Sequence, residues 1–357
     1  MKKSLFCVCL LLGGTLPASA EVTSRFDMNF YGFIKTDFIY SDHGTATNEY
    51  RIYTTAGRND DSFRASARAS RLGVNISTGV ISGKAEADFL GLTDSLAGTA
   101  GTVSDLRLRQ AYVALKLGKA EFLAGQTYYP ITADIPESLN DYYLGNSGAL
   151  WSRAPQLRVT YNATKTLKLI AAAVRPSSKL TDAEGTHSAL PGAQGKVEQS
   201  FGKAKVSLAG AAGIWKSTTT QPTMDVSLVV AAFNVPYSIF TAYGEVWTGR
   251  NLADFLGGLG NTGFGPKGVK SRGGYLALKI KPNENLWFNA IYGVDDPDND
   301  KVSAKGRIRN ATALANSVLR LYDCVETGVE VAELATDYKG GPRRSSMNYQ
   351  LNVKLLF

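Results

Sequence analysis

Basic side chains recur at every second position in several segments, with apolar residues between them. In LRLRQAY, Arg107 and Arg109 alternate with Leu106 and Leu108, so both guanidinium groups lie on one face of an extended chain. The other residues that meet the same test are Arg71, Lys84 and Arg158. A guanidinium group stays charged at any working pH and binds a carboxylate through two parallel hydrogen bonds. A row of such groups is therefore suited to attracting and guiding small carboxylate anions.

The chain offers few residues for catalysis or for binding a metal ion. Its histidines are His43 and His187, and it has no G-x-S-x-G motif, so a serine hydrolase site is not expected. The cysteines are Cys7, Cys9 and Cys324, and they form no cluster with histidine that could hold zinc. We therefore expect no enzyme activity, no cofactor and no metal site. A protease built on two carboxylates at the rim of the molecule stays open as an alternative.

Two further motifs are weak signals for ligand binding. Gly258, Gly260 and Gly263 match a dinucleotide-binding fingerprint as text, but no helix follows them to hold a phosphate. The acidic run DDPDND at residues 295–300 lacks the glycine and glutamate positions of a calcium-binding EF-hand. We expect a solvated acidic turn there, with a loosely bound calcium ion as the alternative.

The elements that must hold the charged residues are β-strands. At the C-terminus, SSMNYQLNVKLLF places Leu351, Val353 and Leu355 on one face, with Gln350 and Asn352 on the other. Such a strand has one face in an apolar medium and one in a polar medium, which suits either a soluble sandwich or a membrane barrel. Sixteen strands are predicted: residues 30–40, 63–78, 84–90, 106–116, 120–126, 156–161, 167–174, 193–200, 204–215, 224–233, 238–247, 271–280, 286–294, 308–322, 325–338 and 347–357.

The connections between these segments alternate in length along the whole chain. Short turns such as LGK, NATK, FGK, NVP and DC alternate with long connections such as residues 127–155 and 248–270. Outer-membrane barrels have this pattern, with short periplasmic turns and long extracellular loops. The predicted fold is therefore all-β: a 16-stranded antiparallel transmembrane β-barrel around a wet channel. The last strand should close against the first, because lipid tolerates no unpaired strand edge.

One predicted strand, residues 63–78, does not keep a strict alternation. With Leu72 on the lipid face, strict alternation would send Arg64 and Arg68 outward as well. A bulge near Ser70 would return both arginines to the lumen. Without a bulge, they would lie at the outer rim or at a subunit interface.

The N-terminus predicts export from the cytoplasm. Residues 1–20, MKKSLFCVCLLLGGTLPASA, combine Lys2 and Lys3 with a short apolar run and small residues before Glu21, as in a secretory signal peptide. We expect residues 1–20 to be removed and residues 21–357 to form the barrel domain in the outer membrane of a Gram-negative bacterium. The formal net charge is +8, but an exported chain with scattered basic residues is not expected to bind nucleic acid.

Several stretches, in their order along the chain, resemble known porins. YGFIKTDFIY, SRLGVNIST, GKAEADFLG and the C-terminal aromatic strand are similar to the general trimeric porins. GEVWTGRNL with GGLGNTG, and later RNATALANSVLRL, resemble the DcaP-like porins. The resemblance extends over residues 28–357 and implies a trimeric 16-stranded diffusion channel. It also implies a preference for small anions, dicarboxylates in particular.

The resemblance further implies that the third long connection, residues 127–155, folds into the barrel and narrows it. This connection carries Asp134, Glu137 and Asp141, which we expect to face a basic wall. The expected members of that wall are Arg71, Lys84, Arg107, Arg109, Arg158 and, at the end of the connection, Arg153. A field between the two sides would orient polar solutes and concentrate anions. The alternative is that these charges only pair and hold the loop, which would give a general porin without selectivity.

The expected partners follow from this interpretation. They are small anionic solutes and the lipid and lipopolysaccharide of the outer membrane. Small residues in LIAAAV and LAGAAG suit close contact between barrels and, with the resemblance, predict a homotrimer. The terminal Phe357 is the signal that we expect the barrel assembly machinery to read. An adhesive or purely structural barrel stays as an alternative to a channel.

Overall fold

The computed structural model describes residues 25–46, 50–57, 60–91, 105–175, 190–215 and 223–357. The predicted signal peptide, residues 1–20, lies outside these ranges. None of the helices in the described part of the chain is long and apolar enough to cross a membrane. The strands are β1 (Asp27–Ser41), β2 (Ser62–Ser66), β3 (Arg71–Thr78), β4 (Ile81–Asp88), β5 (Arg107–Leu117), β6 (Ala120–Tyr128), β7 (Arg153–Asn162), β8 (Leu167–Val174), β9 (Gly192–Phe201), β10 (Ala204–Trp215), β11 (Met224–Tyr237), β12 (Phe240–Arg250), β13 (Lys270–Asn283), β14 (Leu286–Pro297), β15 (Arg307–Leu321), β16 (Val325–Tyr338) and β17 (Arg344–Leu356).

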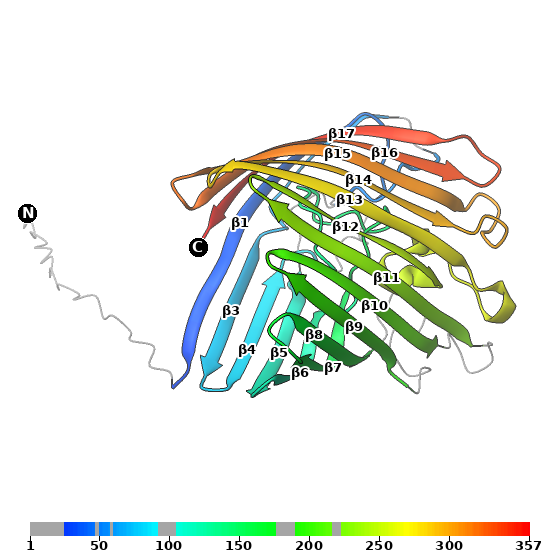
Figure 1. Cartoon of the computed structure of the whole chain (residues 1–357). Helices are drawn as coiled ribbons and strands as arrows, with labels where there is room; N and C mark the ends of the chain where they lie inside the picture. The colour runs from blue at the N-terminus through cyan, green and yellow to red at the C-terminus, as the bar shows by residue number, and fades with distance from the viewer. Residues whose placement is uncertain (1–24, 47–49, 58–59, 92–104, 176–189, 216–222) are drawn as a thin grey trace, which may run out of the picture.

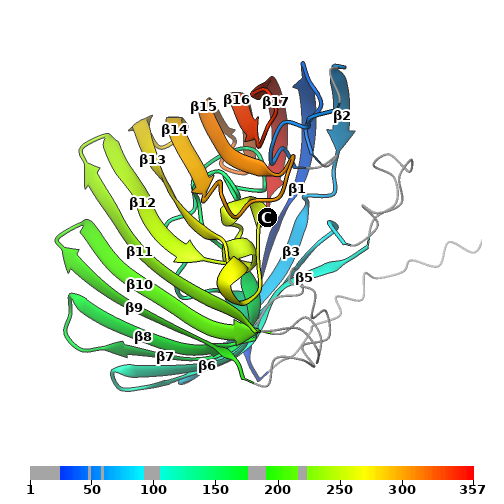
Figure 2. The same ribbon diagram turned by 90° about the vertical axis from the view of Figure 1, so that its right-hand side faces the viewer.

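The strands form one closed antiparallel sheet (Figures 1 and 2). Each strand from β3 to β17 pairs with the next, and β1 closes the ring by pairing with β17 along the register from Phe33↔Leu356 to Ser41↔Asn348. The terminal Phe357 exchanges two backbone hydrogen bonds with Gly32, at 2.9 and 3.2 Å. Since β2 and β3 both pair with β1, they are two parts of one interrupted strand. The predicted 16-stranded barrel, with its last strand closing on the first, is confirmed.

The interruption between β2 and β3 is the predicted bulge. On β1, Phe33 pairs with Arg71 and Asp37 pairs with Ser66, so the interrupted strand has one residue more than β1 over this stretch. The extra residue shifts the alternation, which leaves Phe63 and Leu72 both exposed on the outer face. Arg64 therefore lies on the inner face with Arg71, and Arg68 is buried, its Nε donating to the carbonyl oxygen of Phe89 at 3.3 Å.

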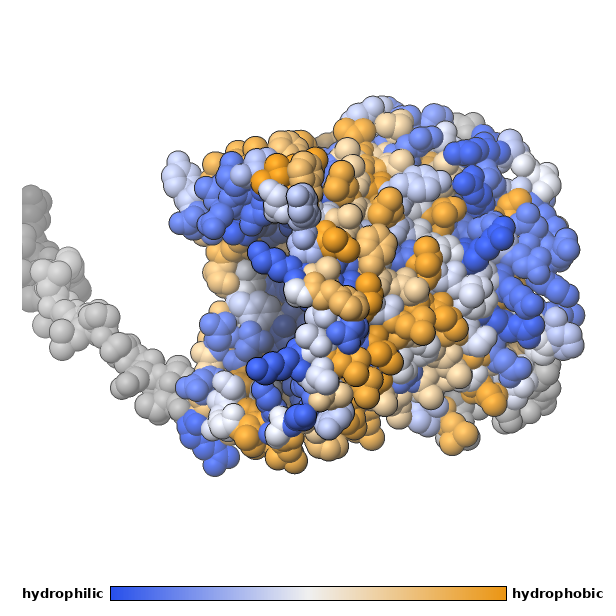
Figure 3. All heavy atoms as spheres, viewed as in Figure 1, coloured by the Kyte–Doolittle hydropathy of each residue, from blue (hydrophilic) through white to orange (hydrophobic). Residues whose placement is uncertain are grey.

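The outer face of the sheet is apolar and the inner face is polar, which is the reverse of a soluble protein. On β17, Tyr349, Leu351, Val353 and Leu355 are exposed, whereas Asn348, Gln350 and Asn352 between them are buried. The same holds on β4, where Glu86 and Asp88 are buried and Ala85 is exposed. Apolar side chains cover the middle of the strands, and polar residues gather toward the ends (Figure 3). The outer face suits lipid, and the inner face suits water and charged side chains.

The predicted turn at NVP is wrong. Pro236 belongs to β11 and pairs with Thr241, and the chain reverses at Ser238, whose φ is 53°. Val235 and Tyr237 stay exposed on the outer face, so the apolar surroundings extend the strand past the proline. The other predicted strands differ from the observed ones by a few residues at their ends.

The third loop, residues 129–152, lies against the inner face of strands far from its own ends. Lys35 Nζ of β1 donates to the carbonyl oxygen of Leu139 at 3.0 Å, and Leu150 N donates to Glu245 Oε1 of β12 at 2.6 Å. At Gly148, where φ is 112°, an added Cβ would lie 2.8 Å from the backbone nitrogen of Val294. A side chain at this position would therefore push the loop off the barrel wall.

Two further loops contact the third loop, and the sequence predicted neither contact. In the sixth loop, residues 251–269, three short helices η2 (Leu252–Phe255), η3 (Gly258–Gly260) and η4 (Gly265–Lys267) follow β12. Tyr129 Oη donates to Asp254 Oδ2 at 2.7 Å, and Asn146 N donates to the carbonyl oxygen of Leu256 at 2.6 Å. In the first loop, Arg51 offers its carbonyl oxygen to Asn140 Nδ2 at 2.8 Å. The first, third and sixth loops thus meet at the long-loop end of the barrel (Figure 2).

Candidate functional site

Glu330 on β16 fastens the third loop to the barrel wall. Its carboxylate accepts hydrogen bonds from Ser138 Oγ at 3.0 Å, Leu139 N at 2.8 Å and Asn316 Nδ2 at 3.0 Å. The Arg51 guanidinium lies 3.4 Å away and also donates to Gln350. The Glu330 side chain is completely buried, so this one carboxylate joins the first and third loops to β15 and β16 at the inner wall.

The three carboxylates of the third loop all have partners. Asp141 Oδ2 lies 2.5 Å from Lys35 Nζ, and Glu137 Oε1 lies 2.6 Å from Lys279 Nζ on β13. Asp134 Oδ2 accepts from Asn234 Nδ2 at 2.8 Å.

Burial alone would raise the pKa of the Asp141 carboxyl, but the Lys35 ammonium outweighs burial and holds the pKa below its ordinary value. These carboxylates bond to Lys35, Lys279 and Asn234 rather than to the arginines predicted from the sequence.

Two of the predicted arginines pair with the neighbouring strand instead. Arg107 binds Asp88 through Nε and Nη2 at 2.9 and 2.6 Å, and Arg109 contacts Glu86 at 2.7 Å and Asp88 at 2.8 Å. Arg71 lies 3.9 Å from Glu86. This inner-wall cluster therefore has three guanidinium groups against two carboxylates. It is a charge network with a positive excess, and not the bare basic wall expected from the sequence.

Three of the predicted cations form no ion pair within the described part of the chain: Lys84, Arg153 and Arg158, the last of which is attracted by Glu121 from a greater distance. Lys84 Nζ lies 4.9 Å from the ring centre of Tyr31. Arg153 lies over the rings of Tyr128 and Trp151, at 5.1 and 5.5 Å from their centres. Cation–π contacts of this kind hold a side chain without neutralising its charge. These charges stay available to a passing anion.

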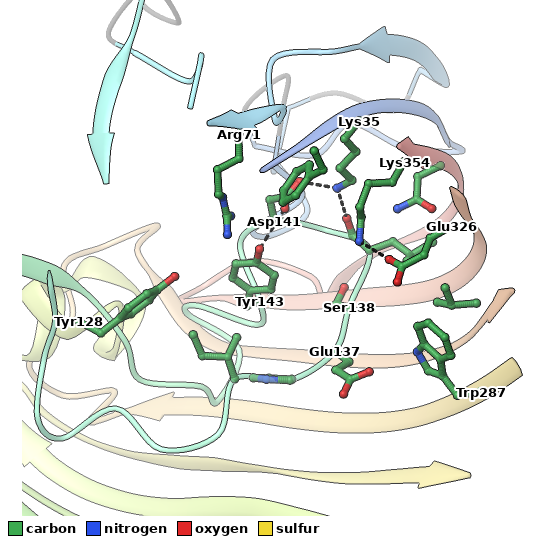
Figure 4. Close-up of a pocket in the computed structure, with 16 residues that line it drawn as sticks. Lys35, Arg71, Tyr128, Glu137, Ser138, Asp141, Tyr143, Trp287, Glu326 and Lys354 are labelled. Atoms are coloured by element: carbon green, nitrogen blue, oxygen red, sulfur yellow. Dashed lines mark hydrogen bonds and ion pairs between the residues drawn. The ribbon is translucent and has the colours of Figure 1, made fainter. Parts of the chain in front are cut away.

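A cavity of about 370 Å³ lies between the third loop and the strands at the short-turn end of the barrel (Figure 4). Lys35, Arg71 and Lys354 line it together with Glu137, Asp141 and Glu326. Arg71 and Lys354 both lie over the ring of Phe33, at 5.0 and 5.4 Å from its centre. Lys354 also pairs with Glu326 at 2.7 Å. Charges of both signs thus face one space that is large enough for a small solute.

Several of these residues are absent from the sequence-based site: Lys35, Lys279, Lys354, Glu86, Asp88, Glu326 and Glu330. Alternation does show that each points inward, because each directly follows an apolar residue on a strand. It does not show which cation meets which carboxylate.

The acidic run at residues 295–300 does not converge on one point. Asp295 is buried on the inner face and accepts from Leu259 N at 3.3 Å, whereas Asp296 pairs with Arg272 at 3.1 Å. Among the described residues, no group of three or more His, Cys, Asp or Glu side chains could hold a metal ion. The calcium alternative therefore gains no support here.

A closed antiparallel barrel with an apolar outer face, a charged lumen and an inward loop defines a porin-type channel of the outer membrane. A family model described as DcaP outer membrane protein matches residues 14–198, more than half of the sequence. The chain belongs to this family. It is an outer-membrane channel of a Gram-negative bacterium and not an enzyme.

Solved structures show the same fold. The outer membrane channel DcaP of Acinetobacter baumannii is 22% identical, with a TM-score of 0.81, over 93% of this chain and 97% of that one. An anion-selective porin from Comamonas acidovorans is 13% identical, with a TM-score of 0.64, over 93% of this chain and 100% of that one. OmpT of Vibrio cholerae in its trimer form is 11% identical, with a TM-score of 0.61, over 94% and 100%. No curated protein matches the sequence significantly.

Proposed function

We propose that the channel favours small anions, dicarboxylates among them. The observation that carries the proposal is an imbalance of free charge in the lumen. The acidic groups of the third loop are each held by an ammonium or amide group, whereas Lys84, Arg153 and Arg158 form no ion pair in the described part of the chain. A confined lumen screens these cations less than an open surface would. An anion is therefore attracted, and a partly hydrated one can leave again, as conduction requires.

A solute with two carboxylates suits these spaced cations better than a solute with one carboxylate. The free cations lie on β4 and β7, and Arg71 adds a further guanidinium group at the edge of the cavity. A solute with a charge at each end can contact one cation before it releases the previous one. The anion-selective porin from Comamonas acidovorans supports the proposal only as an example of such selectivity on the same fold.

Neutralising the free cations tests the proposal. In the triple variant Lys84→Gln/Arg153→Gln/Arg158→Gln, we expect the reversal potential in a salt gradient to shift toward cations and dicarboxylate flux to fall several-fold. One unit charge contributes about 1 kcal/mol at 4 Å even in bulk water, and more in a confined lumen. The matched control is Lys119→Gln/Lys165→Gln/Lys203→Gln, which removes three lysines from the short turns. Equal ion selectivity in the triple variant and the control would refute the proposal and leave a general porin.

We also propose that residues 21–357 assemble as a homotrimer after export. Alanine and glycine residues of β8 and β10 share the outer face with Leu169 and Leu208, so two barrels could approach closely there. The Vibrio cholerae relative has a structure described as a trimer form. Single insertion events in a planar bilayer should give conductance in three equal steps, and native mass spectrometry should give three times the mass of the chain. A single step with a monomer mass would contradict this assembly.

A further inference from the structure

A groove crosses the outer face of β12, β13 and β14. It has a volume of about 500 Å³ and lies on the lipid side of the wall, because its rim includes Val246, Leu276 and Tyr292, which are all exposed. Gly274 pairs with Val246 on one side and with Val294 on the other. Because Gly274 has no side chain, the outer face is hollow at this position, whereas the side chains around it project into the lipid.

One end of the groove is charged. Arg272, Asp296 and Arg309 line this end. Arg272 pairs with Asp296 at 3.1 Å, yet 80% of its side chain is exposed. Arg309 forms no ion pair within the described part of the chain. The lining of the mouth thus has two guanidinium groups and one carboxylate, while Asp337 lies opposite Arg309 on β16 and forms no ion pair with it.

A second hollow of about 440 Å³ continues beyond Arg272 and Asp296 toward the acidic run. It is lined by Lys270 but also by Asp298 and Asp300, which would repel an anion. An anionic group is therefore better placed on the Arg309 side of Arg272.

The position of the groove along the barrel determines which leaflet of the membrane it faces. β13 begins at Lys270, directly after the sixth loop, so the charged mouth lies at the long-loop end of the barrel. In an outer-membrane barrel that end is extracellular, and the adjoining lipid is the outer leaflet. The apolar part of the groove then points toward the middle of the membrane.

We propose that this groove binds one acyl chain of a phosphorylated glycolipid of the outer leaflet, with a phosphate held between Arg272 and Arg309. Guanidinium groups bind phosphate through paired hydrogen bonds, and the apolar part removes a lipid chain from contact with other lipids. The groove has a volume of about 500 Å³, which fits a single acyl chain better than the broad side of a second barrel.

Native mass spectrometry of the full-length protein in detergent tests this site. The probes are diphosphorylated lipid A, its dephosphorylated form and a dioleoyl phosphatidylglycerol. The test variants are Arg272→Gln/Arg309→Gln, which removes the phosphate contacts, and Val294→Phe, which fills the groove. Their controls are Lys165→Gln in a short turn and Val229→Phe on the outer face of β11.

We expect the protein to hold diphosphorylated lipid A most tightly and each test variant to bind it about tenfold or more weakly, as the loss of charge-assisted hydrogen bonds or of the apolar contact implies. The controls should bind as the unaltered protein does, and all variants should keep its conductance. Unchanged lipid A binding in both test variants would overturn the site. Equal affinity for phosphatidylglycerol would overturn the assignment to a glycolipid. Loss of oligomer mass in Val294→Phe without loss of lipid would identify the groove as a subunit contact instead.

Discussion

Replacing Arg107 and Arg109 by alanine should shift the reversal potential strongly toward cations. In the unaltered channel, the cluster on β3, β4 and β5 has three guanidinium groups and two carboxylates. Without the two arginines, Arg71 alone faces Glu86 and Asp88, so the local charge changes sign. Two unit charges 4 Å apart interact by about 4 kcal/mol at an effective dielectric constant of about 20. A hydrated anion passes farther away, yet we still expect a several-fold loss of anion permeability.

The structure also predicts a cost in stability for this variant. Arg109 is 4% exposed and Asp88 only 1%, so the change leaves the buried Asp88 carboxylate without either of its guanidinium partners. Breaking a buried ion pair from one side typically costs about 3–5 kcal/mol. The variant should therefore unfold at a lower temperature, as followed by the heat-dependent mobility of the barrel in detergent gels.

A variant that also lacks the two carboxylates separates the effect of charge on selectivity from the effect of lost stability. Arg107→Ala/Arg109→Ala with Glu86→Gln/Asp88→Asn removes both carboxylates as well, so Arg71 remains without opposing charge. Its selectivity should return toward anions. If the double and the quadruple variant have the same reversal potential, and both are folded, the charge of this cluster does not control selectivity.

Replacing Glu330 by alanine should release the third loop from the wall and raise the conductance. The change removes the acceptor of hydrogen bonds from Ser138, Leu139 and Asn316 and leaves the Arg51 guanidinium buried without its carboxylate. Hydrogen bonds to a charged group contribute about 1.5–3 kcal/mol each, so the loss of these bonds should leave the loop weakly held. We expect larger and noisier single-channel currents, together with faster flux of neutral sugars.

Glu333 on the same strand supplies the control. It is exposed on the outer face, three positions from Glu330, so Glu333→Ala changes the same residue type without touching the loop. Its conductance should match that of the unaltered channel. Identical single-channel currents in both variants would show that Glu330 does not hold the constriction in place.

The narrowing of the channel depends on three loops and not on one. Tyr50 of the first loop packs on Tyr142, with 5.4 Å between ring centres, and Tyr129 packs edge-on against Phe255 of the sixth loop at 5.4 Å. The sixth loop buries Leu252 and Leu259 almost completely. Both loops therefore brace the third loop from the long-loop end.

Much of this architecture is determined by the sequence alone. A strand has a side-chain period of two, so Gln350 and Asn352 must face the opposite side from Leu351 and Val353, whatever the strand pairs with. The same rule sends Glu86 and Asp88 inward. Together with alternating short and long connections, it fixes the barrel, the closing strand and the polar lumen. It also indicates a bulge before Arg71, although a strand without a bulge, with Arg64 and Arg68 at the outer rim or a subunit interface, stayed open until the pairing with β1 was known.

Only the tertiary structure decided which charges meet. Lys35 and Asp141 are 106 positions apart, and Glu330 and Leu139 are 191 apart, so their contact depends on where the ring closes and how the loop crosses it. Arg107 of β5 pairs with Asp88 of β4, but the long connection between these strands does not determine their register. The register also shifts between Glu86 and Ala87. Periodicity is a local property of the backbone and assigns each side chain to a face. The choice of partner is a property of the closed cylinder, because it depends on distances across the lumen that no local pattern contains.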